Sequence, residues 1–167
     1  MADRKLVVDD SMIFYTGLMN FPELYRVIDS FFYEKGYDKW EKTNVERVFP
    51  TGRQIDIEME PWKKITDYFE SRINLKIKTL DLKDVEVEME GVRLNLQQGR
   101  LMIKVDAYLR SDYKEKWETP IKMFLRTLLD KYVFKNYYIK HERWVINDVK
   151  QLQERIKAHL NTYGKYA

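Results

Sequence analysis

The sequence predicts an α+β fold in which an antiparallel meander sheet is covered by a long C-terminal helical segment. Between residues 53 and 113 apolar and charged side chains alternate, which is typical of strands with one buried and one solvated face. From about residue 119 to 164 the apolar residues recur at helical spacing instead. The length of 167 residues indicates one domain, 1–167, and the 44% hydrophobic content suffices for a core.

The N-terminal part predicts a strand followed by a helix. Residues 11–19 form a β-branched and aromatic run that ends at a turn signal. Asn20 can cap the helix that follows, with Pro22 in its first turn and Glu23 three residues after the cap. Gly36 is placed to end this helix.

The middle of the chain predicts consecutive strands with short connections, which favours a meander. Pro61 indicates an edge position or a bulge, a loop is expected at 80–84, and Gly91 is expected to turn or kink the chain. The run "QQG" at 97–99 is expected to end a strand. The predicted strands are 39–50, 53–62, 65–79, 85–90, 92–96 and 100–113.

The charged residues of this sheet predict the register in which the strands on either side of residues 80–84 pair. If the loop at 80–84 centres on Leu82, Lys78 lies opposite Glu86 and Lys76 lies opposite Glu88. Opposite charges directly across strands stabilise a pairing by a few tenths to about 1 kcal/mol each. The charged face is therefore expected outside, and the apolar face is expected beneath a cover.

That cover is expected to be the C-terminal segment, 119–164. Thr119 can cap a helix and Pro120 suits its first position. A single helix of this length would run about 65 Å, whereas a domain of this size has a radius of gyration of roughly 15 Å. We therefore expect two helices with a break near Asn136. The expected apolar positions are Ile121, Leu125, Leu128 and Tyr132, then Ile139, Ile146, Val149, Leu152, Ile156, Leu160 and Tyr163.

The element order resembles the helix-grip arrangement of START-like and Bet v 1-like proteins. The text "GRLMIKVDAYLRSDYKEKWETP" with "FLRTLLDKY" and "IKAHLNTY" also resembles a group of small uncharacterised archaeal proteins with this layout. The resemblance implies a curved sheet that wraps the last helix and leaves an apolar cavity between them. The sequence departs from that pattern in having one longer helix after the first strand, and a C-terminal segment too long for one gripping helix.

Composition narrows the function mainly by exclusion. Cysteine is absent, which excludes disulfides, thiolate nucleophiles and thiolate zinc sites. The first ten residues lack a signal-peptide core, and no stretch approaches the ~20 apolar residues of a membrane-spanning helix. We expect a soluble cytoplasmic protein. Residues 131–167 carry eight Lys/Arg against three Asp/Glu, so the positive charge is concentrated at the C-terminal end, where nucleic acid, an acidic partner or a membrane surface can bind.

Residues for catalysis are sparse. His141 and His159 are 18 residues apart, which separates them by about 27 Å along one helix and excludes a shared metal. Each is expected to be solvated or to cap a helix. Asp9 and Asp10 with Ser11 form an acidic cluster, for which a turn or cap role is expected over a cation site. We therefore predict no enzyme activity, no cofactor and no metal.

The leading functional interpretation is a non-catalytic binding protein that holds an apolar small molecule between the sheet and the C-terminal helix. The candidate ligand residues are Trp40, Trp62, Trp117 and Phe124. The alternative is an assembly protein, including a homodimer, or an RNA- or ribosome-associated protein that uses the basic aromatic C-terminal surface. The candidate residues for that surface are Lys131, Lys135, Lys140, Arg143 and Lys150. The same composition also arises when rings pack on a sheet and lysines reach solvent past them.

Overall fold

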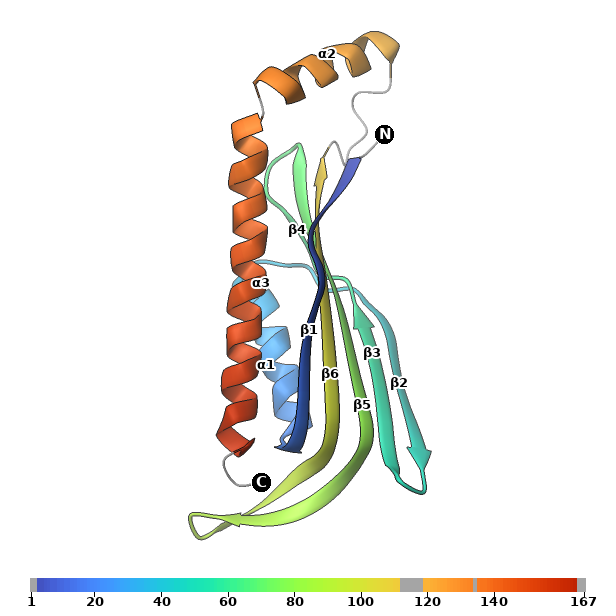
Figure 1. The fold of residues 1–167 in the computed structure, drawn as a ribbon, viewed down its shortest axis with the longest axis vertical. Coiled ribbons are helices and arrows are strands. Elements are labelled where there is room, and N and C mark those ends of the chain that lie inside the picture. Colours follow the sequence, from blue (N-terminus) through green and yellow to red (C-terminus); the bar gives the residue numbers. More distant parts are fainter. Residues whose placement is uncertain (1–2, 112–118, 134, 165–167) are drawn as a thin grey trace.

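A computed structural model describes residues 3–111, 119–133 and 135–164. The order of elements begins with a strand and helix and ends with two helices, as predicted (Figure 1). The elements are β1 (Asp3–Met19), α1 (Phe21–Glu34), β2 (Glu41–Phe49), β3 (Gly52–Met59), β4 (Trp62–Lys64), β5 (Phe69–Met89), β6 (Val92–Ser111), α2 (Pro120–Tyr132) and α3 (Lys135–Gly164).

All strands of the sheet pair antiparallel, in the order β1-β6-β5-β3-β2, with β4 beside β5. The strands from β2 to β6 follow the expected meander, and β1 pairs with β6 as an edge strand of the open sheet. Figure 1 shows α1 and α3 on one face of the sheet, with the ends of β5 and β6 near their shared turn bending beneath the two helices. The fold class predicted from the sequence is therefore confirmed.

The expected loop at 80–84 and the expected strand end at 97–99 are wrong, because β5 and β6 each run through these positions. A register shift between Leu80 and Lys83 bends β5 there, and Asp81 has a φ of 55°. The bend brings two backbones close together: a Cβ on Gly99 would lie 2.9 Å from the carbonyl oxygen of Leu80. Glycine at position 99 thus permits the bend rather than ending the strand.

The expected register of the charged face is wrong for the same reason. The hairpin turns at Glu90 and Gly91, so Glu86 and Glu88 pair with residues of β6 and not with the lysines of β5. Lys76 instead lies opposite Glu58, and Lys78 lies opposite Asp56, both on β3. Opposite charges still face each other across strands, as the pairing principle requires.

Helix α1 begins where its sequence predicts. The side-chain oxygen of Asn20 accepts a hydrogen bond from the Glu23 backbone N–H at 3.2 Å, with Pro22 in the first turn. This cap satisfies one of the orphan donors of the helix. Gly36, with a φ of 74°, follows the last turn.

The core lies between the inner face of the sheet and helices α1 and α3. The predicted face of β5 is confirmed, because Phe69, Ser71, Ile73, Leu75 and Ile77 are all buried. Helix α3 covers the sheet through Val145, Val149, Leu152, Ile156 and Leu160, each no more than 2% exposed.

The C-terminal segment forms two helices, as expected: α2 ends at Tyr132 and α3 begins at Lys135, next to the expected break at Asn136. Helix α2 does not share in covering the sheet, which corrects the prediction for its apolar residues. Figure 1 shows α2 lying across one end of the molecule, beyond the N-terminal end of α3. Ile139 also remains exposed, and the packed face of α3 begins with the half-buried Tyr138, whose ring centroid lies 4.8 Å from that of Phe69.

Candidate functional site

An apolar pocket of about 220 Å³ lies where helix α2, the N-terminal end of α3 and the start of β5 meet. It is the place where a molecule could sit between the sheet and the C-terminal helices. Its volume exceeds the roughly 150 Å³ of a cavity that holds benzene and lies below the roughly 300 Å³ of a drug-sized site. The lining residues are Thr66, Tyr68, Phe69, Arg126, Leu129, Tyr137 and His141.

His141 lines this pocket with a polar side chain that is almost fully buried. It is 5% exposed, and its Nδ1 is buried without a hydrogen-bond partner in the part of the chain that the structure describes. Its ring centroid lies 4.9 Å from that of Phe69 and 5.3 Å from that of Trp144. Burial, and then the positive charge of Lys140, lower the pKa of His141. The imidazole is therefore neutral at neutral pH and holds an unused hydrogen-bonding nitrogen.

The expectation that His141 is solvated or caps a helix is thus wrong. His141 precedes Val145 and Val149 at intervals of four residues, which places all three on one helical face. This spacing is the sequence signal that could have identified it as buried. His159, by contrast, lies between helices α3 and α1, with its Nε2 3.3 Å from the backbone carbonyl oxygen of Asn20.

A polar cluster forms the wall of the pocket beneath α2. Arg126 is 7% exposed, and its Nε donates to the Tyr68 hydroxyl at 2.9 Å. The same guanidinium donates to Ser111 Oγ at 3.3 Å and lies 3.5 Å from a carboxylate oxygen of Asp130. Burial, with neighbouring hydroxyl and carboxylate groups, raises the pKa of Tyr68. The cluster ties α2 to the ends of β5 and β6 and keeps the pocket roof in place.

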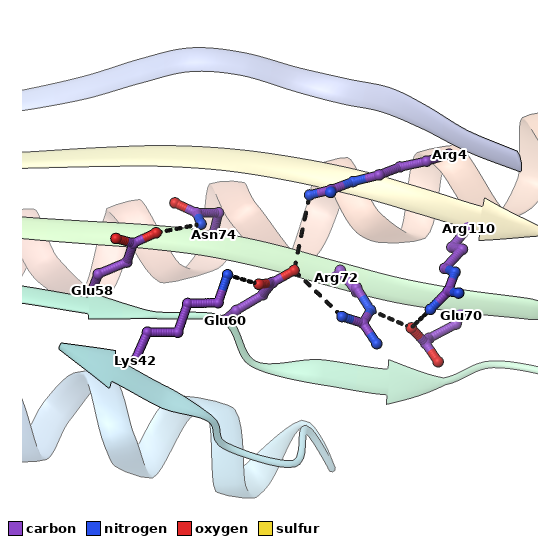
Figure 2. A network of polar contacts seen from close by, with 8 residues as sticks. All are labelled: Arg4, Lys42, Glu58, Glu60, Glu70, Arg72, Asn74 and Arg110. Carbon is purple, nitrogen blue, oxygen red and sulfur yellow. Dashed lines mark hydrogen bonds and ion pairs between the residues drawn. The ribbon is translucent and has the colours of Figure 1, made fainter. Parts of the chain in front are cut away.

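The outer face of the sheet carries a pair of buried carboxylates, Glu60 and Glu70 (Figure 2). Arg72 lies between them, with Nε 2.5 Å from Glu70 Oε1 and Nη1 3.4 Å from Glu60 Oε1. Lys42 also bonds to Glu60, and Arg4 approaches it at 3.9 Å.

Burial alone would raise the pKa of Glu60, but Lys42 and Arg72 outweigh it and hold this pKa below the usual value. Glu60 is therefore a charged ion-pair partner rather than a proton donor at neutral pH. An acid–base pair needs one carboxyl whose pKa is raised enough for it to donate a proton, and Lys42 and Arg72 act on Glu60 in the opposite direction. We interpret the network as structural.

The acidic cluster expected near the N-terminus lies within strand β1 and not in a flexible end. Ligand oxygens of Asp9, Asp10 and Asp106 lie within 4.8 Å of one another. Lys104 bonds to Asp10 and lies 3.7 Å from Asp106, and the Asp10 N–H donates to Asp106 at 2.7 Å. Asp10, and then Asp106, raise the pKa of Lys104. The lysine ammonium thus already supplies the cation that these carboxylates hold.

A second hollow of about 550 Å³ lies between α1 and the inner face of β2 and β3. Its floor is apolar, with Phe21, Ile55 and Leu82, and its rim is charged. Arg53 on this rim bonds to Glu46 at 3.2 Å and to Asp84 at 2.7 Å. These bonds pair the charges of Arg53, Glu46 and Asp84 with one another within the protein.

The structure does not bring the predicted ligand residues together. Trp40 is exposed beside Lys42, Trp62 lies half-buried in β4, and Phe124 is exposed on α2. None of the three lines the His141 pocket or the hollow beside α1. Trp117 lies outside the described residues.

The predicted basic residues are all exposed, but they divide between two helices. Lys131 lies on α2 and Lys135 begins α3. Lys140, Arg143 and Lys150 share the solvent face of α3, opposite its buried residues.

No family model matches this chain, and no curated protein is similar to it. Nothing in these comparisons or in the geometry of the described residues indicates catalysis. Among the helices of the described residues, none is both long enough and apolar enough to cross a membrane.

Proposed function

We propose that the protein is a non-catalytic binding protein that holds a small, mainly apolar molecule in the His141 pocket. The observation that carries this proposal is the Nδ1 of a neutral, buried imidazole in the wall of an apolar pocket, which no described residue hydrogen-bonds. A buried polar atom without a partner costs about 1–3 kcal/mol. A ligand that hydrogen-bonds to this nitrogen removes that cost, and its apolar part fills the pocket.

The chemistry of the pocket selects a ring-sized ligand with one hydrogen-bonding group. Phenol and toluene are suitable probes, because they share size and shape and differ in the hydroxyl. One hydrogen bond contributes about 0.5–1.5 kcal/mol, which corresponds to an affinity up to about tenfold higher for phenol.

The test follows the imidazole nitrogens by NMR in protein labelled with 15N at histidine. Phenol is expected to shift the His141 resonances in a saturable manner and to leave those of His159 unchanged. Leu129→Trp is expected to abolish the effect, because Leu129 lines the pocket. Leu128→Trp is the matched control, since the neighbouring side chain is exposed on the other side of α2. Equal shifts at both histidines, or none at His141, would sink the proposal.

A second candidate function is binding of RNA or of an acidic partner by the solvent face of α3. Lys140, Arg143 and Lys150 share this face, and the Lys140 ammonium lies 5.2 Å from the centroid of the half-exposed Trp144 ring. A ring beside cations can stack on an unpaired base while the cations contact phosphates. With three contacts, the logarithm of the affinity for a U-rich oligonucleotide should fall with the logarithm of salt concentration with a slope of about −2. A slope unchanged in Lys140→Gln/Arg143→Gln would remove this face from consideration.

A further inference from the structure

Helix α2 exposes its apolar side rather than burying it. The most exposed members are Ile121 at 75%, Tyr132 at 72% and Phe124 at 64%. Leu125 and Leu128 are 47% and 40% exposed. We refer to these five residues as the α2 stripe. Spacings of three and four residues place them along one side of the helix.

The opposite side of α2 faces the protein and carries both polar and apolar residues. Arg126 is buried there, with the Tyr68 hydroxyl and Ser111 as hydrogen-bond partners, and Leu129 and Asp130 beside it are half-buried. Because α2 packs by the side that carries Arg126, the α2 stripe has no partner in the described structure. Surface apolar groups that gather into a patch mark an interaction surface, whereas scattered ones do not.

The position of α2 suits a broad, flat partner. Figure 1 shows the helix lying across the end of the molecule, and its hydrogen bonds to the ends of β5 and β6 fix which side faces inward. The α2 stripe therefore points away from the body. A planar surface can reach it along the length of the helix.

The charge around the α2 stripe indicates which kind of planar partner surface can bind it. Residues 119–135 carry four Lys/Arg and one acidic residue, Asp130, for a net charge of +3. Asp130 is turned inward beside Arg126. Lys122 and Lys131 thus flank, on the same helix, an apolar stripe that contains aromatic rings. This composition matches helices that lie in the plane of an anionic lipid interface, with the apolar side among the acyl chains and lysines at the headgroups.

We propose that α2 docks the protein on an anionic membrane surface, with the α2 stripe inserted at the boundary between headgroups and acyl chains. The helix lies in the interface and does not span it. This proposal is independent of the His141 pocket, because the α2 stripe and the pocket lie on opposite sides of α2.

The experiment is co-flotation of the full chain with vesicles of phosphatidylcholine alone or of phosphatidylcholine and phosphatidylserine at about 7:3. Binding to the anionic vesicles and not to the neutral ones is expected, because lysines near an anionic surface are attracted to its headgroups. Leu125→Gln/Leu128→Gln should weaken partitioning at least about tenfold, since it removes inserted apolar area. Lys122→Glu/Lys131→Glu should do the same through charge.

The matched control is Val48→Gln/Phe49→Gln, which removes two exposed apolar side chains from β2, remote from α2. It should bind vesicles as the parent does, and circular dichroism verifies that every variant folds. Equal binding to both vesicle types, or anionic binding that survives Leu125→Gln/Leu128→Gln, overturns the proposal. The proposal is also overturned if the protein binds neither vesicle type and forms a dimer that Leu125→Gln/Leu128→Gln dissociates. That result would assign the α2 stripe to contact with a second copy of the chain.

Discussion

Replacing His141 by Phe is expected to stabilise the protein while it removes the polar group of the pocket. The Nδ1 of His141 is buried and has no hydrogen-bond partner among the described residues, and such an atom costs about 1–3 kcal/mol. A phenyl ring can keep the contacts with Phe69 and Trp144 and can extend into the adjoining pocket. We expect the free energy of unfolding to rise by about 1–2 kcal/mol, which for a chain of this length raises Tm by roughly 2–8 °C.

The matched control is His159→Phe, which has the opposite expected sign. His159 Nε2 lies within hydrogen-bonding distance of the Asn20 carbonyl oxygen, so its loss should lower the free energy of unfolding by about 1 kcal/mol. Urea unfolding followed by circular dichroism measures both variants. A loss of more than about 1 kcal/mol in His141→Phe would refute the reasoning, because it would show that the imidazole nitrogen has a partner.

The difference in stability between His141→Phe and the parent protein should depend on pH, and its direction follows from the pKa of His141. The pKa of His141 in the folded protein lies below its ordinary value of 6.5. Below pH 6.5 the unfolded chain therefore binds a proton at this residue that the folded protein excludes, and stability falls with acidification until pH passes the folded-state pKa. The stability advantage of His141→Phe over the parent should grow as pH falls below about 6.5. An advantage that stays constant from pH 7.5 to 5 would contradict the assigned burial.

The remaining predictions concern stability and are measured by chemical denaturation at pH 7. Ile103→Ala should cost about 2–5 kcal/mol, because Ile103 is fully buried, whereas Ile121→Ala on the exposed α2 stripe should change stability by less than about 0.5 kcal/mol. Glu60→Gln should cost about 1–3 kcal/mol by leaving its basic neighbours without their buried anion, and an unchanged stability would mean that solvent already screens this network. Asn20→Ala should cost about 1 kcal/mol through loss of the cap on the Glu23 N–H, and a neutral effect would show that water replaces that cap.

Features that depend on neighbouring residues could be predicted from the sequence. The cap and first turn of α1 and the alternating face of β5 follow from local spacing and side-chain chemistry. The division of the C-terminal segment into two helices follows from its length, which exceeds the size of the domain. The general pairing of opposite charges across strands also holds. Its partners do not, because the turn residue Gly91 closes a much longer hairpin than the local pattern indicates.

Contacts between distant residues required the tertiary structure. Gly99 permits a strand bend rather than an end, because the backbone of Leu80 approaches it from another strand. The pairing of β1 with β6 places the first strand of the chain beside the last strand, at one edge of the sheet, and no local signal specifies it.

The candidate sites divide in the same way. The basic and aromatic character of the C-terminal end, and the helical spacing of the α2 stripe, are properties of the sequence by itself. The sequence could not show which side of α2 packs against the protein. Apolar periodicity predicts that the apolar side is buried, whereas the bonds of Arg126 to Tyr68 and Ser111 turn the side that carries Arg126 inward. Nor could it show that His141 forms part of an apolar pocket, because that depends on Phe69 and Leu129, which are remote from it along the chain. Local periodicity determines which residues share a face, and only the packing of distant elements decides what that face meets.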